Sequence, residues 1–234
     1  MKKIQTYRLL IGLFLTFAVT ALAVVLRHVV QLNSGFFTST FLSAPIILLL
    51  SIVLIVAFRR QLNFRLSMPT FKQVWKPFLV GLLTSIAVSI FTGILTLVFH
   101  GRAEVHPAFV GATVLQFVFF TLIITPVAEE LLFRGFLLNY LKPLDGKGVK
   151  LFGRNISLRV LVTALVFSLC HLGLLASGVG TVFMIRTLVF AFILGTIAGY
   201  YQEKYDNIVP AIIVHMAGNF MGLFSVILMN YHGS

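Results

Sequence analysis

Residues 126–141 read PVAEELLFRGFLLNYL, a stretch that places two carboxylates and a guanidinium inside a long apolar run. The chain has only six acidic residues in 234, so the adjacent pair Glu129 and Glu130 needs a physical reason. On a helix, Glu130 and Arg134 are i, i+4 neighbours that can form an ion pair, whereas Glu129 is rotated about 100° from Glu130. We predict that Glu130 supports Arg134 and that Glu129 is left free for chemistry.

The composition around this stretch is that of a membrane protein, with 59% hydrophobic and 10% charged residues. The charge-free runs approach or exceed the roughly 20 residues of a membrane-spanning helix, and none alternates like a barrel strand. We predict an all-α, polytopic membrane helix bundle of about seven to eight transmembrane helices, with the catalytic groups inside the bundle. The runs are Leu9–Leu26, Gln31–Phe58, Pro77–His100, Val105–Ala128, Val160–Ile185, Thr187–Gln202 and Asn207–Ser234.

The fourth run is too long for one crossing if the helix continues to Leu141. As continuous helix, the segment from Val105 to Leu141 would measure about 55 Å, against a bilayer core of about 30 Å. Because Pro126 removes a backbone donor and clashes with the preceding turn, we predict a kink near Thr125 and Pro126.

Basic side chains gather in alternate loops, as the positive-inside rule describes. The N-terminus and the second and fourth loops carry most of them, while the first, third and fifth loops carry only Arg27, Arg102 and Arg186. This pattern predicts a cytoplasmic N-terminus and, despite a formal charge of +12, no nucleic-acid partner. The start of the chain resembles a signal peptide, but we predict an uncleaved first span, because its charge-free core Leu9–Leu26 is longer than the usual signal core and six more spans follow. The second loop, with Phe64 and Trp75, either lies on an anionic leaflet or is a solvated loop. We treat residues 1–234 as a single integral membrane domain.

Two later runs carry polar groups that suit the free carboxylate. His171 follows Phe167 by one turn in LVFSLCHLG, and His215 and Asn219 share a helix face in IIVHMAGNF. Polar groups are costly in a bilayer core, so these side chains should face protein or water. A carboxylate with an imidazole can deprotonate a water and later protonate a leaving amine, while a second imidazole and an amide can stabilise an oxyanion. The set predicts peptide hydrolysis without a covalent nucleophile.

The same residues also bear on other catalytic mechanisms. Glu129, His171 and His215 would also suit Zn²⁺, which accepts two histidines and a glutamate with a water in the open position. No HExxH motif is present, and Asp145 and Asp206 lie in predicted loops, which disfavours zincin-type and aspartyl membrane proteases. We predict that the lone Cys170 is a small apolar residue, and that the remaining histidines are interfacial: His28, His100, His106 and His232.

The segments EELLFR, FSLCH and HMAGN occur in the order EExxxR, FxxxH and HxxxN, on three separate spans. In that order they resemble the motifs of the CAAX prenyl protease and bacteriocin-processing family, also called the Abi family, of intramembrane endopeptidases. The likeness covers residues 126–222, which we take as the catalytic core. The resemblance implies a catalytic cavity open to the cytoplasmic side. It also implies that water is activated by Glu129 with His171, that the oxyanion is held by His215 and Asn219, and that the site is supported by Glu130, Arg134 and Phe167.

The resemblance leaves the substrate and the cofactor open. The family has been described both as metalloendopeptidases and as glutamate-type enzymes, so we commit to no metal and keep zinc as the alternative. Bacterial members are linked to bacteriocin processing and self-immunity, so we expect a peptide or membrane-protein substrate in a bacterial plasma membrane. Two further functions remain open: a non-catalytic immunity or membrane scaffold protein that keeps the motifs for structure, and a proton-coupled transporter.

Overall fold

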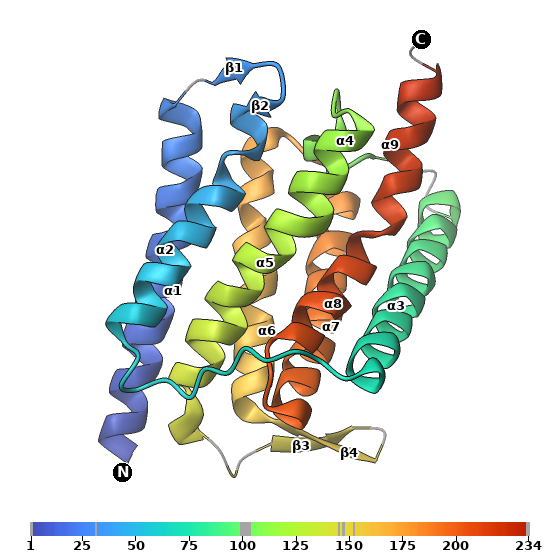
Figure 1. Ribbon diagram of the computed structural model, residues 1–234. Coiled ribbons are helices and arrows are strands. Elements are labelled where there is room, and N and C mark those ends of the chain that lie inside the picture. The colour runs from blue at the N-terminus through green and yellow to red at the C-terminus, as the bar shows by residue number, and fades with distance from the viewer. Residues whose placement is uncertain are drawn as a thin grey trace.

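The computed structural model describes residues 2–30, 32–98, 104–144, 146, 148–151 and 153–232 (Figure 1). Within these ranges, seven helices are long and apolar enough to cross a membrane, which confirms the predicted polytopic helix bundle. The chain is therefore a multi-pass membrane protein. The spans are Ile4–Val29, Ser39–Ala57, Phe71–Val98, Val114–Leu138, Leu158–Ser177, Thr181–Tyr205 and Val209–Tyr231.

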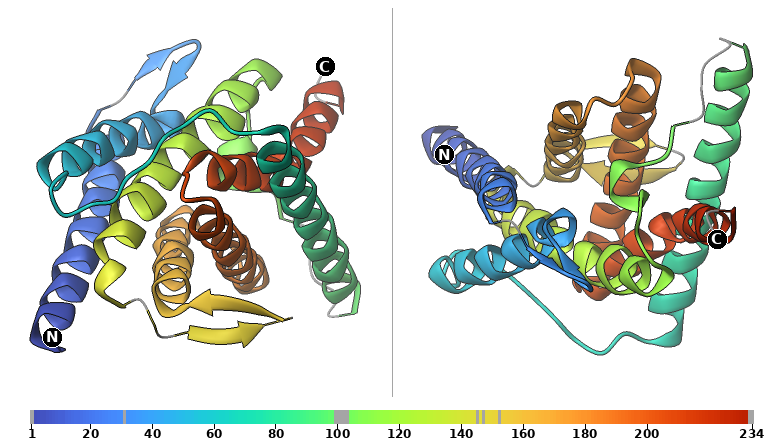
Figure 2. Two further views of the ribbon diagram at one scale, coloured as in Figure 1. Left: turned by 60° about the horizontal axis from the view of Figure 1, so that its bottom comes forward. Right: turned by 90° about the horizontal axis from the view of Figure 1, so that it is seen from above.

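The first three spans come from the N-terminal part of the chain. Its elements are α1 (Lys2–Val29), the hairpin strands β1 (Asn33–Ser34) and β2 (Phe37–Thr38), the 3₁₀ turn η1 (Ser39–Phe41), α2 (Ser43–Ala57) and α3 (Phe71–Val98). α2 packs against α1 and against the fourth span, whereas α3 packs against α8 and α7. The views agree that α3 stands on the opposite side of the bundle from α1 and α2 (Figures 1 and 2).

The remaining four spans contain all the motif residues. The fourth span runs through α4 (Val114–Gln116), the π-helical η3 (Phe117–Ile124), α5 (Thr125–Glu130) and the π-helical η4 (Leu131–Leu138). The hairpin β3 (Gly148–Leu151) and β4 (Arg154–Ser157) leads to the fifth span. The later elements are α6 (Leu158–Cys170), the 3₁₀ segment η6 (His171–Ser177), α7 (Thr181–Tyr205), α8 (Val209–Asn219) and α9 (Met221–His232).

The helix of the fourth span is shorter than the sequence predicts, because it begins later in the chain. Residues 104–113 are not part of the helix: they contain a 3₁₀ turn, η2 (Pro107–Phe109), and Gly111 with a φ of 72°. The helix begins only after Thr113, which forms a capping box with Gln116. At Pro126, where the sequence predicts a kink, the helix is unbroken and changes from π-helical to α-helical hydrogen bonding.

Close helix contacts occur where the sequence has small residues. A Cβ added to Gly195 would lie 3.3 Å from Ala164 of α6, and one added to Gly199 would lie 3.0 Å from Val160 of α6. These two glycines of α7 therefore let α6 approach closely. Arg186, predicted to lie in the fifth loop, instead lies inside α7, because that helix already begins at Thr181.

The two ends of the bundle differ in charge. The end that holds the N-terminus also holds segment 58–70, the strands β3 and β4 and segment 206–208, and we call it the basic face (Figure 1). Segment 58–70 is fastened there by reciprocal hydrogen bonds between the Ser67 backbone and the Asn207 side chain. Arg27 near the end of α1 and Arg186 near the start of α7 belong to the other end, which we call the opposite face.

Candidate active site

The predicted ion pair of the EExxxR motif is present and buried. Arg134 Nη1 lies 3.0 Å from Glu130 Oε1, and the two side chains are 0% and 1% exposed. Arg134 Nη2 donates to the Gly195 carbonyl of α7 at 2.8 Å. A Cβ at Gly195 would lie only 2.9 Å from that same nitrogen, so the glycine leaves room for the guanidinium. Glu130 and Arg134 thus join the fourth and sixth spans.

His215 of α8 lies between the two glutamates. Its Nδ1 is 2.8 Å from Glu130 Oε1, and its Nε2 is 3.7 Å from Glu129 Oε2. Because a carboxylate accepts hydrogen bonds, the short contact places a proton on Nδ1 and turns Nε2 towards Glu129. The 3.7 Å gap is longer than a direct hydrogen bond, and it suits a contact that tightens or is bridged when substrate binds.

Glu129 differs from its neighbour in burial and in partners. Its side chain is 20% exposed, against 1% for Glu130. Within the described residues, no arginine or lysine forms an ion pair with Glu129. The carboxylate beside His215 is therefore reachable and uncommitted, as the rotation about the helix predicts.

Phe167 is the common neighbour of the site's cation and both histidines. Its ring meets those of His171 and His215 edge to face, with centroids 5.0 Å and 5.5 Å away, and the Arg134 guanidinium lies 4.9 Å from its centroid. Edge-to-face aromatic pairs and a cation over a ring face are both attractive. The phenylalanine of the FxxxH motif thus fixes the spacing between the two histidines.

His171 is oriented by the end of its own helix. Its Nδ1 lies 2.9 Å from the Phe167 carbonyl, one of the last carbonyls of α6, which lack the usual backbone donor. A carbonyl only accepts, so Nδ1 carries the proton and Nε2 of the neutral ring keeps its lone pair. The described contacts include no hydrogen bond between His171 and Glu129.

Asn219 has a structural partner that the sequence does not reveal. Its Nδ2 donates to the Thr121 carbonyl at 3.1 Å. In a π-helix that carbonyl would receive the N–H of Pro126, which has none, and the Thr125 N–H donates to Phe120 instead. Asn219 thus satisfies a carbonyl that the proline leaves without a donor, and its second amide hydrogen remains available.

Sequence reasoning missed several polar groups that surround the site. The Arg134 carbonyl accepts hydrogen bonds from the side chains of Asn139 and Gln202, both buried. The sequence contains a signal for both residues, because each is a polar amide side chain next to an apolar run.

His106, which the sequence predicts to be interfacial, lies before the fourth span, and His171 acts on it electrostatically. Burial, with the nearby His171 and Arg186, lowers the pKa of His106 to about 4. Its Nδ1 accepts a hydrogen bond from the Ala108 N–H, so the neutral ring fits its surroundings. Of the other three histidines assigned to span ends, His100 lies outside the described residues.

The described residues contain no preformed set of zinc ligands. Among the described residues, no three His, Cys, Asp or Glu side chains are grouped closely enough to hold a metal ion. Glu129 approaches His215, but His171 does not converge on the same point with them. The residues as placed do not fit a bound zinc.

The described contacts therefore link most of the predicted site residues. Glu129, Glu130, Arg134 and His215 form one chain of polar contacts, and Phe167 connects it to His171. Asn219, one turn after His215, is held by the fourth span.

Residues 111–221, just under half of the chain, match a family model described as type II CAAX prenyl endopeptidase Rce1-like. The matched segment contains all three motifs. Comparisons with curated proteins and with solved structures found no match. A member of this family is a membrane-bound endopeptidase with a peptide substrate, in agreement with the seven spans and the polar site within them. Over residues 111–221 the chain is therefore similar to the Rce1-like family of type II CAAX prenyl endopeptidases, which supports the resemblance carried by the three motifs.

Proposed function

We propose that the protein hydrolyses a peptide bond inside the membrane with water activated by Glu129 and His171. The observation that carries the proposal is the uncommitted Glu129 carboxylate, 3.7 Å from His215 Nε2, while Glu130 binds the other ring nitrogen. This arrangement leaves one carboxylate free to accept a proton and gives the histidine a fixed orientation.

In the proposed reaction, Glu129 accepts one proton of the water while His171 Nε2 accepts a hydrogen bond from the other O–H. The water oxygen attacks the peptide carbonyl, and the carbonyl π electrons move to its oxygen. The proton on Glu129 then passes to the leaving nitrogen as the C–N bond breaks. The products are a new carboxyl group and a new amine.

The oxyanion would be stabilised by His215 and Asn219. A protonated His215 presents its Nε2–H on the reacting side, and Glu130 balances its charge at Nδ1. Asn219 offers the amide hydrogen that Thr121 does not use. Removal of one oxyanion donor typically costs about 100- to 1,000-fold in kcat, so each of these residues should matter measurably.

The proposal also includes the orientation of the protein and the membrane in which it lies. The basic face would lie in the cytoplasm, by the positive-inside rule, which makes the N-terminus cytoplasmic. We place the enzyme in a bacterial plasma membrane, with a short peptide or a membrane-protein segment as substrate. The catalytic core is the motif region 126–222 of a single membrane domain.

The proposal is tested by comparing wild-type protein with Glu129→Gln in proteoliposomes containing membrane peptides from the native host. Cleaved peptides identified by mass spectrometry should appear with the wild type and disappear with Glu129→Gln. Undiminished cleavage by the variant would refute the role of Glu129. Metal analysis and activity after chelation test the zinc-dependent version. A scaffold or immunity protein would instead keep its cellular phenotype in the variant.

A further inference from the structure

The segment between the second and third spans, residues 58–70, crosses the outer side of the bundle at the basic face. It runs from the end of α2 to the start of α3, passing in front of the later spans in Figure 1 and lying outside the helices when seen from above in Figure 2. After a turn at 58–61 it contains neither helix nor strand. Contacts with the rest of the protein therefore determine which of its side chains point outward.

This segment is fastened to the bundle in its middle. The Phe64 ring lies against η4, where a Cβ added to Gly135 would come within 3.3 Å of it. The Arg65 carbonyl accepts a hydrogen bond from the Ile208 N–H at 3.2 Å, beside the reciprocal bonds with Asn207 described above. A segment held by both side-chain packing and backbone hydrogen bonds differs from a freely solvated loop.

Beyond these contacts the outward side chains are apolar. Leu66, Met68 and Phe71 are 64%, 96% and 81% exposed. Phe71 begins α3, and Trp75 lies one turn later on the same face. Apolar and aromatic side chains at the edge of a membrane bundle are stabilised among lipid headgroups and upper acyl chains. The exposed side chains therefore favour contact with lipid, and we call residues 65–76 the interfacial segment.

The interfacial segment carries three cations and no carboxylate. Lys72 and Lys76 are i, i+4 neighbours on α3, and among the described residues no carboxylate forms an ion pair with either. The Lys76 ammonium lies 5.5 Å from the centroid of the Trp75 ring, so the basic and aromatic side chains adjoin. Arg65 contacts Asp206 at 3.5 Å, but these side chains are 67% and 58% exposed, and such a surface pair contributes little. Cations beside exposed apolar side chains favour an anionic lipid as ligand.

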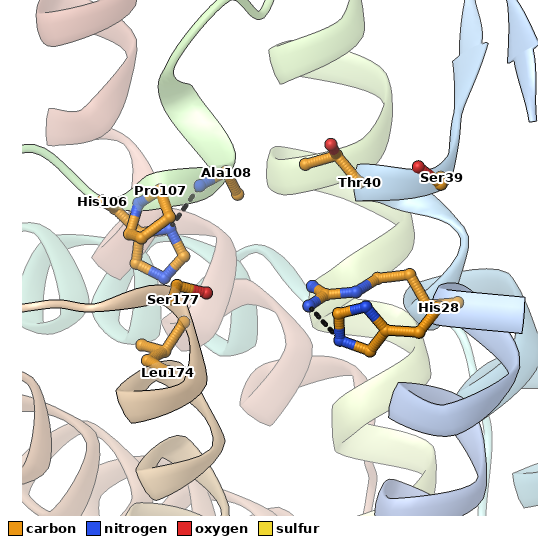
Figure 3. A pocket seen from close by; sticks show the side chains of 9 residues that line it. His28, Ser39, Thr40, His106, Pro107, Ala108, Leu174 and Ser177 are labelled. Carbon is orange, nitrogen blue, oxygen red and sulfur yellow. Dashed lines mark hydrogen bonds between the residues drawn. The ribbon is translucent and has the colours of Figure 1, made fainter. Parts of the chain in front are cut away.

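The two arginines of the opposite face have protein partners instead. Arg27 donates to His28, with Nη2 3.4 Å from Nε2, beside a cavity of about 250 Å³. Figure 3 shows His28 in that cavity, across from His106. Arg186 donates to the Glu104 carbonyl at 3.2 Å. These arginines therefore differ from the lysines of the interfacial segment, which remain available to a ligand.

We propose that the interfacial segment binds the headgroup of an anionic phospholipid in the leaflet at the basic face. Lys72 and Lys76 contact the lipid phosphate, with Arg65 as a further cation, while Met68 and Phe71 lie among the upper acyl chains. The apolar side chains favour a ligand with acyl chains over a free phosphate ion. Because the backbone is fastened, both kinds of side chain stay in one surface, which selects anionic over zwitterionic lipid. This selection does not depend on the proposed hydrolysis.

The chain has one tryptophan, Trp75, and it lies in this surface, so its fluorescence reports on the adjacent lipid. Full-length protein is reconstituted into vesicles of phosphatidylglycerol and phosphatidylcholine in equal amounts, with bromine, which quenches tryptophan, on the acyl chains of one lipid at a time. Brominated phosphatidylglycerol should quench Trp75 more strongly than brominated phosphatidylcholine. Because each lysine near an anionic surface changes binding by about fivefold, the binding constant for the anionic lipid relative to the zwitterionic lipid should be about five or more.

Two matched double variants locate the effect. Lys72→Gln with Lys76→Gln should lower this relative binding constant by about fivefold or more, towards one. Lys142→Gln with Lys150→Gln removes two exposed lysines between the fourth and fifth spans and should leave it unchanged. In vesicles of phosphatidylcholine alone, the brominated lipid should quench Trp75 equally in the wild type and both variants, which shows that the variants are folded.

Equal quenching by the two brominated lipids in the wild type would overturn the proposal. So would a preference that survives the loss of Lys72 and Lys76, or one that the control variant lowers equally, because the effect would then belong to the whole basic face. Absence of quenching by either lipid would also overturn it, since the surface would not face lipid. No peptide enters the measurement, so its result is separate from that of the protease test.

Discussion

The two adjacent glutamates have different surroundings, and glutamine replacement tests that difference. Glu130 is 1% exposed and its Oε1 contacts both Arg134, at 3.0 Å, and His215, at 2.8 Å. Glu129 is 20% exposed and has only the longer 3.7 Å contact with His215. Glutamine has nearly the shape of glutamate, so each change removes a negative charge with little change in packing.

Glu130→Gln should destabilise the fold. It leaves the fully buried Arg134 without its carboxylate, and removing one partner of a buried ion pair typically costs about 3 to 5 kcal/mol. For a chain of this length, that corresponds to a fall in Tm on the order of 10 °C. Glu129→Gln breaks no buried ion pair, so its Tm should stay within about 2 °C of the wild type while its activity is lost.

The assay is thermal unfolding of detergent-solubilised protein, followed by scanning fluorimetry and by loss of the monodisperse peak in size-exclusion chromatography. Both variants and the wild type are measured in one detergent at one pH. A Glu130→Gln protein as stable as the wild type would refute the assignment of Glu130 to a structural ion pair. A Glu129→Gln protein as unstable as Glu130→Gln would refute the separation of roles.

Three further outcomes follow from individual contacts. Gly195→Ala adds a methyl group 2.9 Å from a guanidinium nitrogen and should cost about 1 to 3 kcal/mol in unfolding measurements, whereas Gly93→Ala, with nothing within 4 Å, should be neutral or slightly stabilising. Asn219→Leu leaves the Thr121 carbonyl without its donor and should lower both Tm and kcat, and a purely catalytic asparagine would lower kcat alone. Because burial lowers the pKa of His106 to about 4, the unfolded chain binds more protons, and stability should fall on the order of 3 kcal/mol between pH 6.5 and 4. His106→Gln should flatten that part of the Tm profile.

Local spacing predicted the features that depend on one helix. The Glu130 and Arg134 pair follows from an i, i+4 separation, and the free position of Glu129 follows from rotation about the same axis. The seven spans follow from apolar run length, because a bilayer core requires long apolar helices whatever their neighbours. These features are properties of single segments, so the sequence contains them.

Features that depend on contacts between distant segments could not be predicted from the sequence. Nothing near residue 130 indicates that His215, 85 residues later, binds Glu130 as well as facing Glu129. The link between Asn219 and Thr121 likewise depends on a π-helical turn ending at a proline. For His106 the sequence predicts only an interfacial position, and its contact with Phe183 of α7 and the effect of His171 on its pKa depend on how distant segments pack.

By itself, the sequence determined that this chain is a helical membrane bundle and which ionisable groups must be shielded from lipid, because transfer free energy and helical periodicity act locally. Only the tertiary structure determines which of those ionisable and polar groups contact one another. His215 lies between two carboxylates, a proline's missing hydrogen bond is supplied by Asn219, and a cation lines a cavity at the face opposite the basic loops. Each depends on how separate helices pack together, which the periodicity of a single helix does not specify.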